Sequence, residues 1–156
     1  KEFKSSCEEL RKNNIKVVFS GRKSPLRRDV LEAMDYLRDE TKDNTGGILN
    51  ICLNYGGQSE IVDATKDIVK DVLEGKISKE EITPDLFKKY LYQDLPPVDL
   101  MIRTGGDVRV SNFLLWQIAY AEMYFPNWFW PDFDAKEFDK ALDAYNGRER
   151  RFGGGK

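Results

Sequence analysis

The sequence predicts an α/β fold in which a largely parallel β-sheet carries helices on both faces. Three runs rich in β-branched and apolar residues, at 15–19, 48–54 and 99–102, are typical of buried strands. The segments between them show the apolar spacing of helices. Strands that alternate with helices are joined by crossover connections, which make neighbouring strands parallel. Such sheets bind ligands at the carboxyl ends of their strands, so the loops after the three strands are the first candidates for a site.

A first helix is expected at the start of the chain, where Phe3, Cys7 and Leu10 recur at helical spacing. No capping residue precedes them and the chain does not begin with methionine, so we expect it to be the later part of a longer protein. After the first strand, Ser24 and Pro25 are typical of an N-cap and the first residue of a second helix.

Capping residues mark the remaining helices. They are Ser59 after the second strand, Ser78 with Glu81, Thr83 before Pro84, and Asp134 with Glu137. Gly75 stands where one of these helices is expected to end. A nearly all-apolar helix is expected from Ser111 towards Phe125. No repeat or low-complexity linker interrupts residues 1–156, so we expect them to belong to a single domain.

The composition is that of an ordinary globular protein, with 40% hydrophobic and 33% charged residues. The net charge of −2 gives no overall attraction to nucleic acid, so any anion binding must be local. No histidine is present, which removes the commonest general base and zinc ligand. No run reaches the ~18 apolar residues of a membrane span. Cys7 and Cys52 are expected to be free thiols rather than a disulfide, which fits a reducing compartment.

The loop after the third strand has the residues of an anion site. Arg103 and Arg109 carry planar guanidinium groups that match phosphate oxygens, and two of them suit a diphosphate. Ser111 is expected to cap the following helix, whose first N–H groups favour negative charge. Gly105 and Gly106 would let the backbone approach a ligand. The alternative is a surface turn with two solvated arginines and an ordinary cap.

Glu122 stands out because the helix expected around it is apolar on nearly every side. A buried carboxylate needs an arginine, a metal ion or a bound proton, since an uncompensated charge is costly to bury. A structural salt bridge is one explanation. The functional alternative is a hard cation such as Mg²⁺, which binds through a few carboxylates together with the phosphates of a substrate.

Two other stretches leave a structural and a functional interpretation open. The aromatic run at 125–131 is either packing in a core or interface, or a surface for lipid or stacked bases. The arginine cluster at 148–151 is either a solvated tail or an arm that binds phosphate. No Walker loop, dinucleotide-binding glycine motif or paired-cysteine motif is present.

Three blocks of the sequence together match a known pattern. They are NICLNYGG at 50–57, IRTGGDVRVSNFLLWQIAYAE at 102–122 with WPDF at 130–133, and RERRFGG at 148–154. This pattern resembles the cis-prenyltransferase family, and within it the bacterial undecaprenyl diphosphate synthases. The resemblance extends from about residue 15 to residue 154. The aspartate-rich DDxxD motifs of the trans-prenyltransferases are absent.

The resemblance implies roles for individual positions. The substrate-binding residues would be Arg103, Arg109 and Ser111 for the diphosphate of isopentenyl diphosphate, together with Asn54, Arg151 and Gly153. Arg151 and Gly153 match a tail motif associated with the partner's active site. Glu122 would help bind Mg²⁺, either in the partner subunit's site or from the dimer interface. Asp107 stands where close relatives commonly have glutamate.

The implied reaction adds isopentenyl diphosphate in cis to an allylic, farnesyl-type diphosphate. The product would be a long-chain polyprenyl diphosphate such as the undecaprenyl carrier of cell-wall synthesis. The implied enzyme is a Mg²⁺-dependent cytoplasmic homodimer, which allows a peripheral contact with the inner face of the membrane. The family's catalytic aspartate is expected upstream of Lys1, so this chain alone is expected to be inactive. The alternative is a non-catalytic accessory subunit of a two-subunit enzyme.

Overall fold

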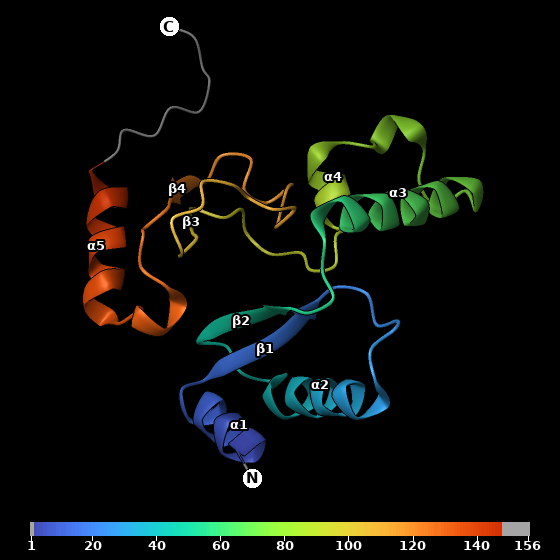
Figure 1. The fold of residues 1–156 in the computed structure, drawn as a ribbon. Helices are drawn as coiled ribbons and strands as arrows, with labels where there is room; N and C mark the ends of the chain where they lie inside the picture. Colours follow the sequence, from blue (N-terminus) through green and yellow to red (C-terminus); the bar gives the residue numbers. More distant parts are fainter. Residues whose placement is uncertain (1, 148–156) are drawn as a thin grey trace, which may run out of the picture. The chain divides into compact units, whose positions relative to one another are not determined.

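The structure is a computed structural model that describes residues 2–147, with side chains from Cys7 onward (Figure 1). The chain divides into two compact units, Lys1–Asp94 and Leu95–Lys156. The first contains α1 (Glu2–Lys12), β1 (Ile15–Ser20), α2 (Arg28–Thr41), β2 (Gly47–Cys52), α3 (Gly57–Leu73), the 3₁₀ helix η1 (Lys79–Glu81) and α4 (Pro84–Lys88). The second contains β3 (Leu100–Ile102), β4 (Glu122–Tyr124), η2 (Trp130–Asp132) and α5 (Ala135–Asn146). Within the described residues, we find no helix with the length and apolar character needed to cross a bilayer.

β1 and β2 form a parallel pair, as the sequence predicts, in a register that begins with Ile15 opposite Gly47. The connection between them runs through α2, which is the crossover that a parallel pair requires. α1 and α2 both pack on β1 and lie on the same side of the strand pair (Figure 1). Cys7, Val17 and Leu37, one from each of these three elements, are buried together and form the core of this unit.

The edge of β1 that faces away from β2 is closed by side chains. Three hydrogen bonds close it: from the Asn44 amide to the Ile15 carbonyl (2.7 Å), from the Val17 N–H to the Thr41 hydroxyl (2.9 Å), and from the Gln93 amide to the Phe19 carbonyl (2.9 Å). An open strand edge is a template for pairing with another strand. These side chains occupy backbone groups that such a strand would need, so β1 is protected on this side.

Two helices begin at other residues than predicted. α3 begins before Ser59, because the Gly56 carbonyl already accepts the first helical hydrogen bond. α2 begins after the predicted start at Pro25, since residues 23–26 form a separate turn closed by a backbone hydrogen bond. The other predicted caps are confirmed: the capping box of Ser78 with Glu81, the hydroxyl of Thr83, and the carboxylate of Asp134 at the start of α5.

In the second unit, β3 and β4 form another parallel pair, with Leu100 opposite Glu122 and Ile102 opposite Tyr124. The described strands therefore make two separate parallel pairs, one in each unit. α5 packs against β4 within the same unit. The predicted α/β class with parallel strands is confirmed.

The helix predicted from Ser111 is not formed. Residues 111–120 make successive turns instead. Ser111, Asn112 and Leu114 have φ angles of 47°, 62° and 46°, and a right-handed helix excludes positive φ. The apolar spacing that suggested a helix is therefore overridden at its first turn.

The prediction that Glu122 lies in an apolar helix is also wrong. Residues 122–124 form β4, whose pairing begins with a bond from the Glu122 N–H to the Asp99 carbonyl (2.9 Å). Pairing with β3 gives the backbone N–H and C=O groups of this segment their hydrogen-bond partners. Glu122 consequently lies at the start of a strand and is only partly buried.

Cys7 and Cys52 are free thiols, as predicted. Burial, followed by the charge of Glu60, raises the pKa of Cys52 to about 11. The Cys52 thiol therefore stays protonated near neutral pH and behaves as a small apolar side chain of β2.

Candidate functional site

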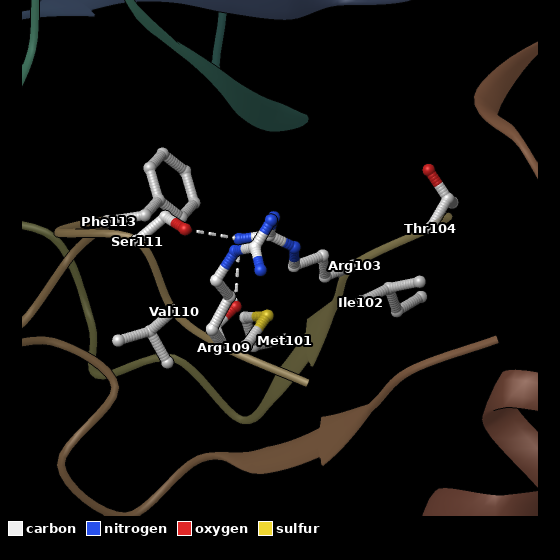
Figure 2. Close-up of a pocket in the computed structure, with 8 residues that line it drawn as sticks. All are labelled: Met101, Ile102, Arg103, Thr104, Arg109, Val110, Ser111 and Phe113. Atoms are coloured by element: carbon white, nitrogen blue, oxygen red, sulfur yellow. Dashed lines mark hydrogen bonds between the residues drawn. The ribbon is translucent and has the colours of Figure 1, made fainter. Parts of the chain in front are cut away.

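A pocket of about 300 Å³ opens after β3, in the loop whose residues predict an anion site (Figure 2). It is lined by Met101, Ile102, Arg103, Thr104, Arg109, Val110, Ser111 and Phe113. The structure thus brings together three of the predicted site residues, Arg103, Arg109 and Ser111. Arg103 directly follows β3, whereas the other two come from the segment after the double-glycine turn.

Arg103 is held against the wall of this pocket by its own loop. Its Nη1 donates to the Ser111 hydroxyl (2.6 Å) and to the Arg109 carbonyl (2.9 Å), and both bonds are dashed in Figure 2. Its Nη2 donates to Asp107 Oδ2 over 3.4 Å. Ser111 therefore serves as an acceptor for Arg103 and not as the helix cap that the sequence suggests, because no helix follows it.

Asp107 bridges the two arginines. Its Oδ2 also accepts a hydrogen bond from Arg109 Nη2, so one carboxylate oxygen contacts both guanidinium groups. The Arg103 side chain is 26% exposed and that of Arg109 is 61% exposed, which makes Arg103 the inner and Arg109 the outer arginine. In the sequence, Asp107 is notable only as a replacement for glutamate. Its place four residues after Arg103 and two before Arg109 was the available signal.

Gly105 and Gly106 shape the turn but offer no backbone donors to a ligand. Their φ angles are 92° and 76°, which favour glycine. Their N–H groups donate to the carbonyls of Trp128 (2.8 Å) and Pro126 (2.9 Å). Both N–H groups are therefore engaged within the chain, and the prediction that the backbone at these glycines approaches a ligand stays a prediction. Part of the aromatic run at 125–131 instead supports this turn.

The donors that remain in the pocket suit an anion. Both hydrogens of Arg103 Nη1 are used, which leaves its Nε and one hydrogen of Nη2. Among the described residues, Arg109 gives only Nη2 to a partner, so its Nε and Nη1 are available. The Ser111 hydroxyl accepts from Arg103 and can still donate its own proton. Two guanidinium edges and one hydroxyl are a donor set for phosphate oxygens.

Glu122 does not belong to this pocket. It pairs opposite Leu100 at the beginning of β3, whereas Arg103 follows the end of that strand. At the rise of an extended strand, three residues correspond to about 10 Å. Glu122 is therefore offset along the strand from Arg103 and lies outside the lining of this pocket.

Among residues 7–147, whose side chains the structure describes, no group of three or more aspartate, glutamate, cysteine or histidine side chains is placed to hold a metal ion. Mg²⁺ typically takes only one or two carboxylates and completes its shell with water and substrate phosphates. The lining of the pocket at Arg103 is rich in donors and includes no carboxylate, and the carboxylate of Asp107 is engaged by both arginines. A Mg²⁺ site can therefore be smaller than such a group, and the predicted metal role of Glu122 stays a prediction.

The loop after β1 also contains an arginine, but its side chain is engaged. Arg22 donates from Nε (2.8 Å) and Nη2 (2.7 Å) to the two carboxylate oxygens of Asp63 on α3. The Tyr92 hydroxyl donates to the same carboxylate (2.6 Å). The bonds from Arg22 and then Tyr92 lower the pKa of Asp63 to about 2, while burial and Asp63 raise that of Tyr92 to about 12. This cluster links three segments and has a structural role.

Glu60 is a buried carboxylate that the sequence interpretation missed. It is 1% exposed and accepts hydrogen bonds from the Tyr55 hydroxyl (2.5 Å) and the Tyr92 N–H (3.1 Å). It thereby ties the loop after β2 to the segment after α4. The available signal was its helical spacing with Ala64 and Ile68, which are buried on the same face of α3.

Of the other predicted site residues, Asn54 is described and two are not. Asn54 has a φ of 50°, and its amide donates to the carbonyls of Arg22 (2.8 Å) and Ser24 (2.9 Å). These bonds hold the loops after β1 and β2 together. Arg151 and Gly153 lie outside the described residues, so their predicted role stays a prediction.

Sequence comparisons identify relatives along nearly the whole chain. A family model described as "Putative undecaprenyl diphosphate synthase" matches residues 1–153. An isoprenyl transferase of Fusobacterium nucleatum is 50% identical over 154 residues, which cover 99% of this chain and 64% of that protein. The Acinetobacter baylyi protein named ditrans,polycis-undecaprenyl-diphosphate synthase ((2E,6E)-farnesyl-diphosphate specific) is 50% identical over 145 residues, covering 92% and 58%. The chain spans less than two thirds of the length of these relatives.

Solved structures agree with the sequence comparisons. Lavandulyl diphosphate synthase from Lavandula x intermedia, in complex with dimethylallyl diphosphate, matches with a TM-score of 0.92 and 32% identity, covering 97% of this chain and 66% of that one. A "probable undecaprenyl diphosphate synthase" from Campylobacter jejuni matches with a TM-score of 0.84 and 33% identity, covering 97% and 69%. Both support the predicted fold class and the family resemblance.

Proposed function

Because this chain belongs to the undecaprenyl diphosphate synthase family, we propose that it is part of a cis-prenyltransferase that joins isopentenyl diphosphate to an allylic diphosphate. The product would be a long-chain polyprenyl diphosphate, such as undecaprenyl diphosphate for cell-wall synthesis. Relatives named isoprenyl transferase and undecaprenyl-diphosphate synthase, each 50% identical to the chain, support this assignment.

The observation that carries the proposal is the convergence of Arg103, Arg109 and Ser111 on one pocket. A diphosphate presents several charged oxygens, and the pocket presents two guanidinium edges and a hydroxyl. Met101 and Phe113 add apolar surface to the same pocket, which suits a short hydrocarbon group. We assign this pocket to isopentenyl diphosphate, with its diphosphate on the arginines.

In this role the residues of the chain bind and orient a substrate. The proposed reaction joins an alkene carbon to an allylic carbon that loses diphosphate, so its rate depends on alignment and on stabilised charge. The contacts of Arg103 with Ser111, Asp107 and the Arg109 carbonyl hold its guanidinium in place in the pocket, which supports a role in aligning a substrate. Mg²⁺, when bound, would neutralise part of the negative charge of the diphosphate.

Binding of isopentenyl diphosphate, measured by isothermal titration calorimetry, tests the pocket. We expect Arg103→Ala with Arg109→Ala to weaken binding by about 100-fold, because two charge-assisted contacts are lost. The matched control is Arg27→Ala with Arg28→Ala, which removes the same charge from exposed arginines paired with Asp29 and Glu32. Unchanged binding in the pocket variant, or equal loss in the control, would refute the assignment.

We also propose that Glu122 helps bind Mg²⁺ in the assembled enzyme, through a second copy of the chain. Its distance along the strand from Arg103 argues against a role in the pocket of its own chain. In the longer protein, Glu122→Gln should raise the Mg²⁺ concentration needed for half-maximal turnover. Unchanged Mg²⁺ dependence with only a lower melting temperature would instead indicate a structural role for Glu122.

The proposed enzyme is a cytoplasmic homodimer, peripheral to the membrane where its long product leaves. Arg151 and Gly153 would act in the partner's site. The accessory-subunit alternative is less well supported, because such a subunit does not need its own set of Arg103, Arg109 and Ser111 around one pocket.

A further inference from the structure

A second pocket, of about 440 Å³, lies entirely within Lys1–Asp94 and beside β1 and α2. Its apolar lining comes from Val18 and Phe19 of β1 and from Leu31 and Met34 of α2. None of its residues belongs to the pocket at Arg103. It is therefore a separate feature of the chain, and the proposed function does not use it.

The basic side chains of this pocket are not neutralised by its acids. Asp35 and Asp39 both line it, but Arg38 pairs with them at 2.9 Å and 3.2 Å. Lys16, Lys23 and Lys42 also line it, and none of the three has an ion-pair or hydrogen-bond partner for its side chain among the described residues. Four basic and two acidic side chains therefore leave a net charge of +2 around the apolar lining, and the three lysines carry the ammonium groups that no described side chain engages.

The pocket is not a groove for another β-strand. Gln93 lines it and donates to the Phe19 carbonyl, which is one of the outward backbone acceptors of β1. Thr41 and Asn44 engage two more outward groups of the same strand. An added strand would have to displace all three side chains, so a ligand that uses side-chain contacts fits the pocket better.

We propose that this pocket binds a single-chain amphipathic anion, with the hydrocarbon chain on Val18, Phe19, Leu31 and Met34 and the phosphate head on the three lysines. Charge complementarity defines the head group, since ammonium groups bind phosphate as point charges. The apolar lining defines the tail, because burying hydrocarbon there removes it from water. A pocket of a few hundred Å³ that combines apolar surface with polar groups is typical of small-molecule sites.

The three methionines of the chain make the test specific. Met34 lines the proposed site, Met101 lines the pocket at Arg103, and Met123 lies in β4 outside both pockets. With the methionine methyl groups labelled with ¹³C, one NMR spectrum reports on both pockets separately. The probes are octyl phosphate below its micelle concentration, inorganic phosphate, and octanol.

We expect octyl phosphate to shift the Met34 methyl signal saturably, and neither inorganic phosphate nor octanol to do so at the same concentration. Lys16→Gln, Lys23→Gln and Lys42→Gln together should weaken octyl phosphate binding about tenfold. The matched control changes Lys66, Lys70 and Lys89 to Gln, since these exposed lysines do not line the pocket. It should alter binding by less than twofold.

Three results would overturn the proposal. The first is an unshifted Met34 signal in the presence of octyl phosphate. The second is equal weakening by the two triple variants, which would mean general charge attraction. The third is a Met34 signal that inorganic phosphate alone, or octanol alone, shifts with the same dissociation constant as octyl phosphate. A shift of Met101 only would place octyl phosphate in the pocket at Arg103, and it too would overturn the second site.

Discussion

The loops after β1 and β3 share their sequence character but differ in what their arginines do. Each loop follows a parallel strand and combines glycine with arginine. Arg22 places Nε and Nη2 on the two oxygens of Asp63, whereas Arg103 and Arg109 share a single oxygen of Asp107. The two-point pair gives Arg22 a carboxylate of its own, so its charge is compensated, whereas the two guanidinium charges at Asp107 share one carboxylate. The shared oxygen leaves several donors of both arginines available.

The acids differ in position as well as in geometry. Asp63 lies on α3, 41 residues from Arg22, and is only 27% exposed, so its pair joins distant segments. Asp107 lies in the same loop as its arginines and is 47% exposed. An ion pair that is local and exposed contributes little to stability. The first loop therefore uses its arginine for the fold, whereas the second leaves its arginines with donors for the proposed anion.

The largest expected effect separates these two roles. Arg22→Gln should lower the melting temperature by about 4–6 °C, because Asp63 loses a two-point partner while remaining largely shielded from solvent. Arg109→Gln should change it by less than about 1 °C. Differential scanning calorimetry measures both, and each variant loses one positive charge, so they control for each other. Similar melting temperatures for the two variants would contradict the comparison.

The acid dependence of stability should differ between the two loops in the same way. The pKa of Asp63 is lowered to about 2, from about 4 in an unfolded chain. Because the folded-state pKa is the lower one, the stabilisation is present above about pH 4 and is lost as the pH falls through about 2. Asp63→Asn should therefore lower the melting temperature by about 2–4 °C at pH 6. This decrease is smaller than that expected for Arg22→Gln, because the amide oxygen of asparagine can still accept hydrogen bonds.

The difference between Asp63→Asn and the unmodified chain should disappear near pH 2, in urea or thermal unfolding followed by circular dichroism. Asp107→Asn is the control, since its carboxylate joins exposed groups within one loop. A stability difference for Asp63→Asn that persists unchanged at pH 2 would show that the carboxylate charge is not what stabilises this cluster.

Three of the four described strands, β1, β2 and β3, and the proximity of Arg103, Arg109 and Ser111 could be predicted from the sequence. Runs such as 15–19 and 48–54 are rich in residues that favour strands, so their own composition predicts their local structure. Arg103, Arg109 and Ser111 fall within eight residues of one another, so their proximity does not depend on the rest of the fold. The parallel direction of β1 and β2 followed from the helix between them.

Features decided by distant contacts could not be predicted. The segment after Ser111 has the apolar spacing of a helix, but left-handed backbone at Ser111 and pairing with β3 at Glu122 give a turn and a strand. Nothing near Arg22 in sequence distinguishes it from Arg103, because its partner Asp63 lies on α3. Glu60 looks like an ordinary residue of a helix until Tyr55 and Tyr92 are placed against it.

The smallest predicted effect concerns Asp107 and tests the idea that it positions Arg109. Among the described residues, Asp107 is the only side-chain partner of Arg109, whereas Arg103 has two other acceptors. Removing the carboxylate should therefore release Arg109 and leave Arg103 in place. We expect Asp107→Asn to weaken isopentenyl diphosphate binding about three- to tenfold by calorimetry, and Asp107→Glu to retain most of the affinity.

A double-mutant cycle distinguishes this indirect role from a general effect of charge. In an Arg109→Ala background, Asp107→Asn should have almost no further effect on binding, because the residue through which it acts is gone. An equal loss in both backgrounds would mean that Asp107 acts independently of Arg109. Tighter binding of isopentenyl diphosphate by Asp107→Asn would mean that the carboxylate competes with the diphosphate for the arginines, and the shared oxygen would then be an obstacle to the ligand and not a support for its site.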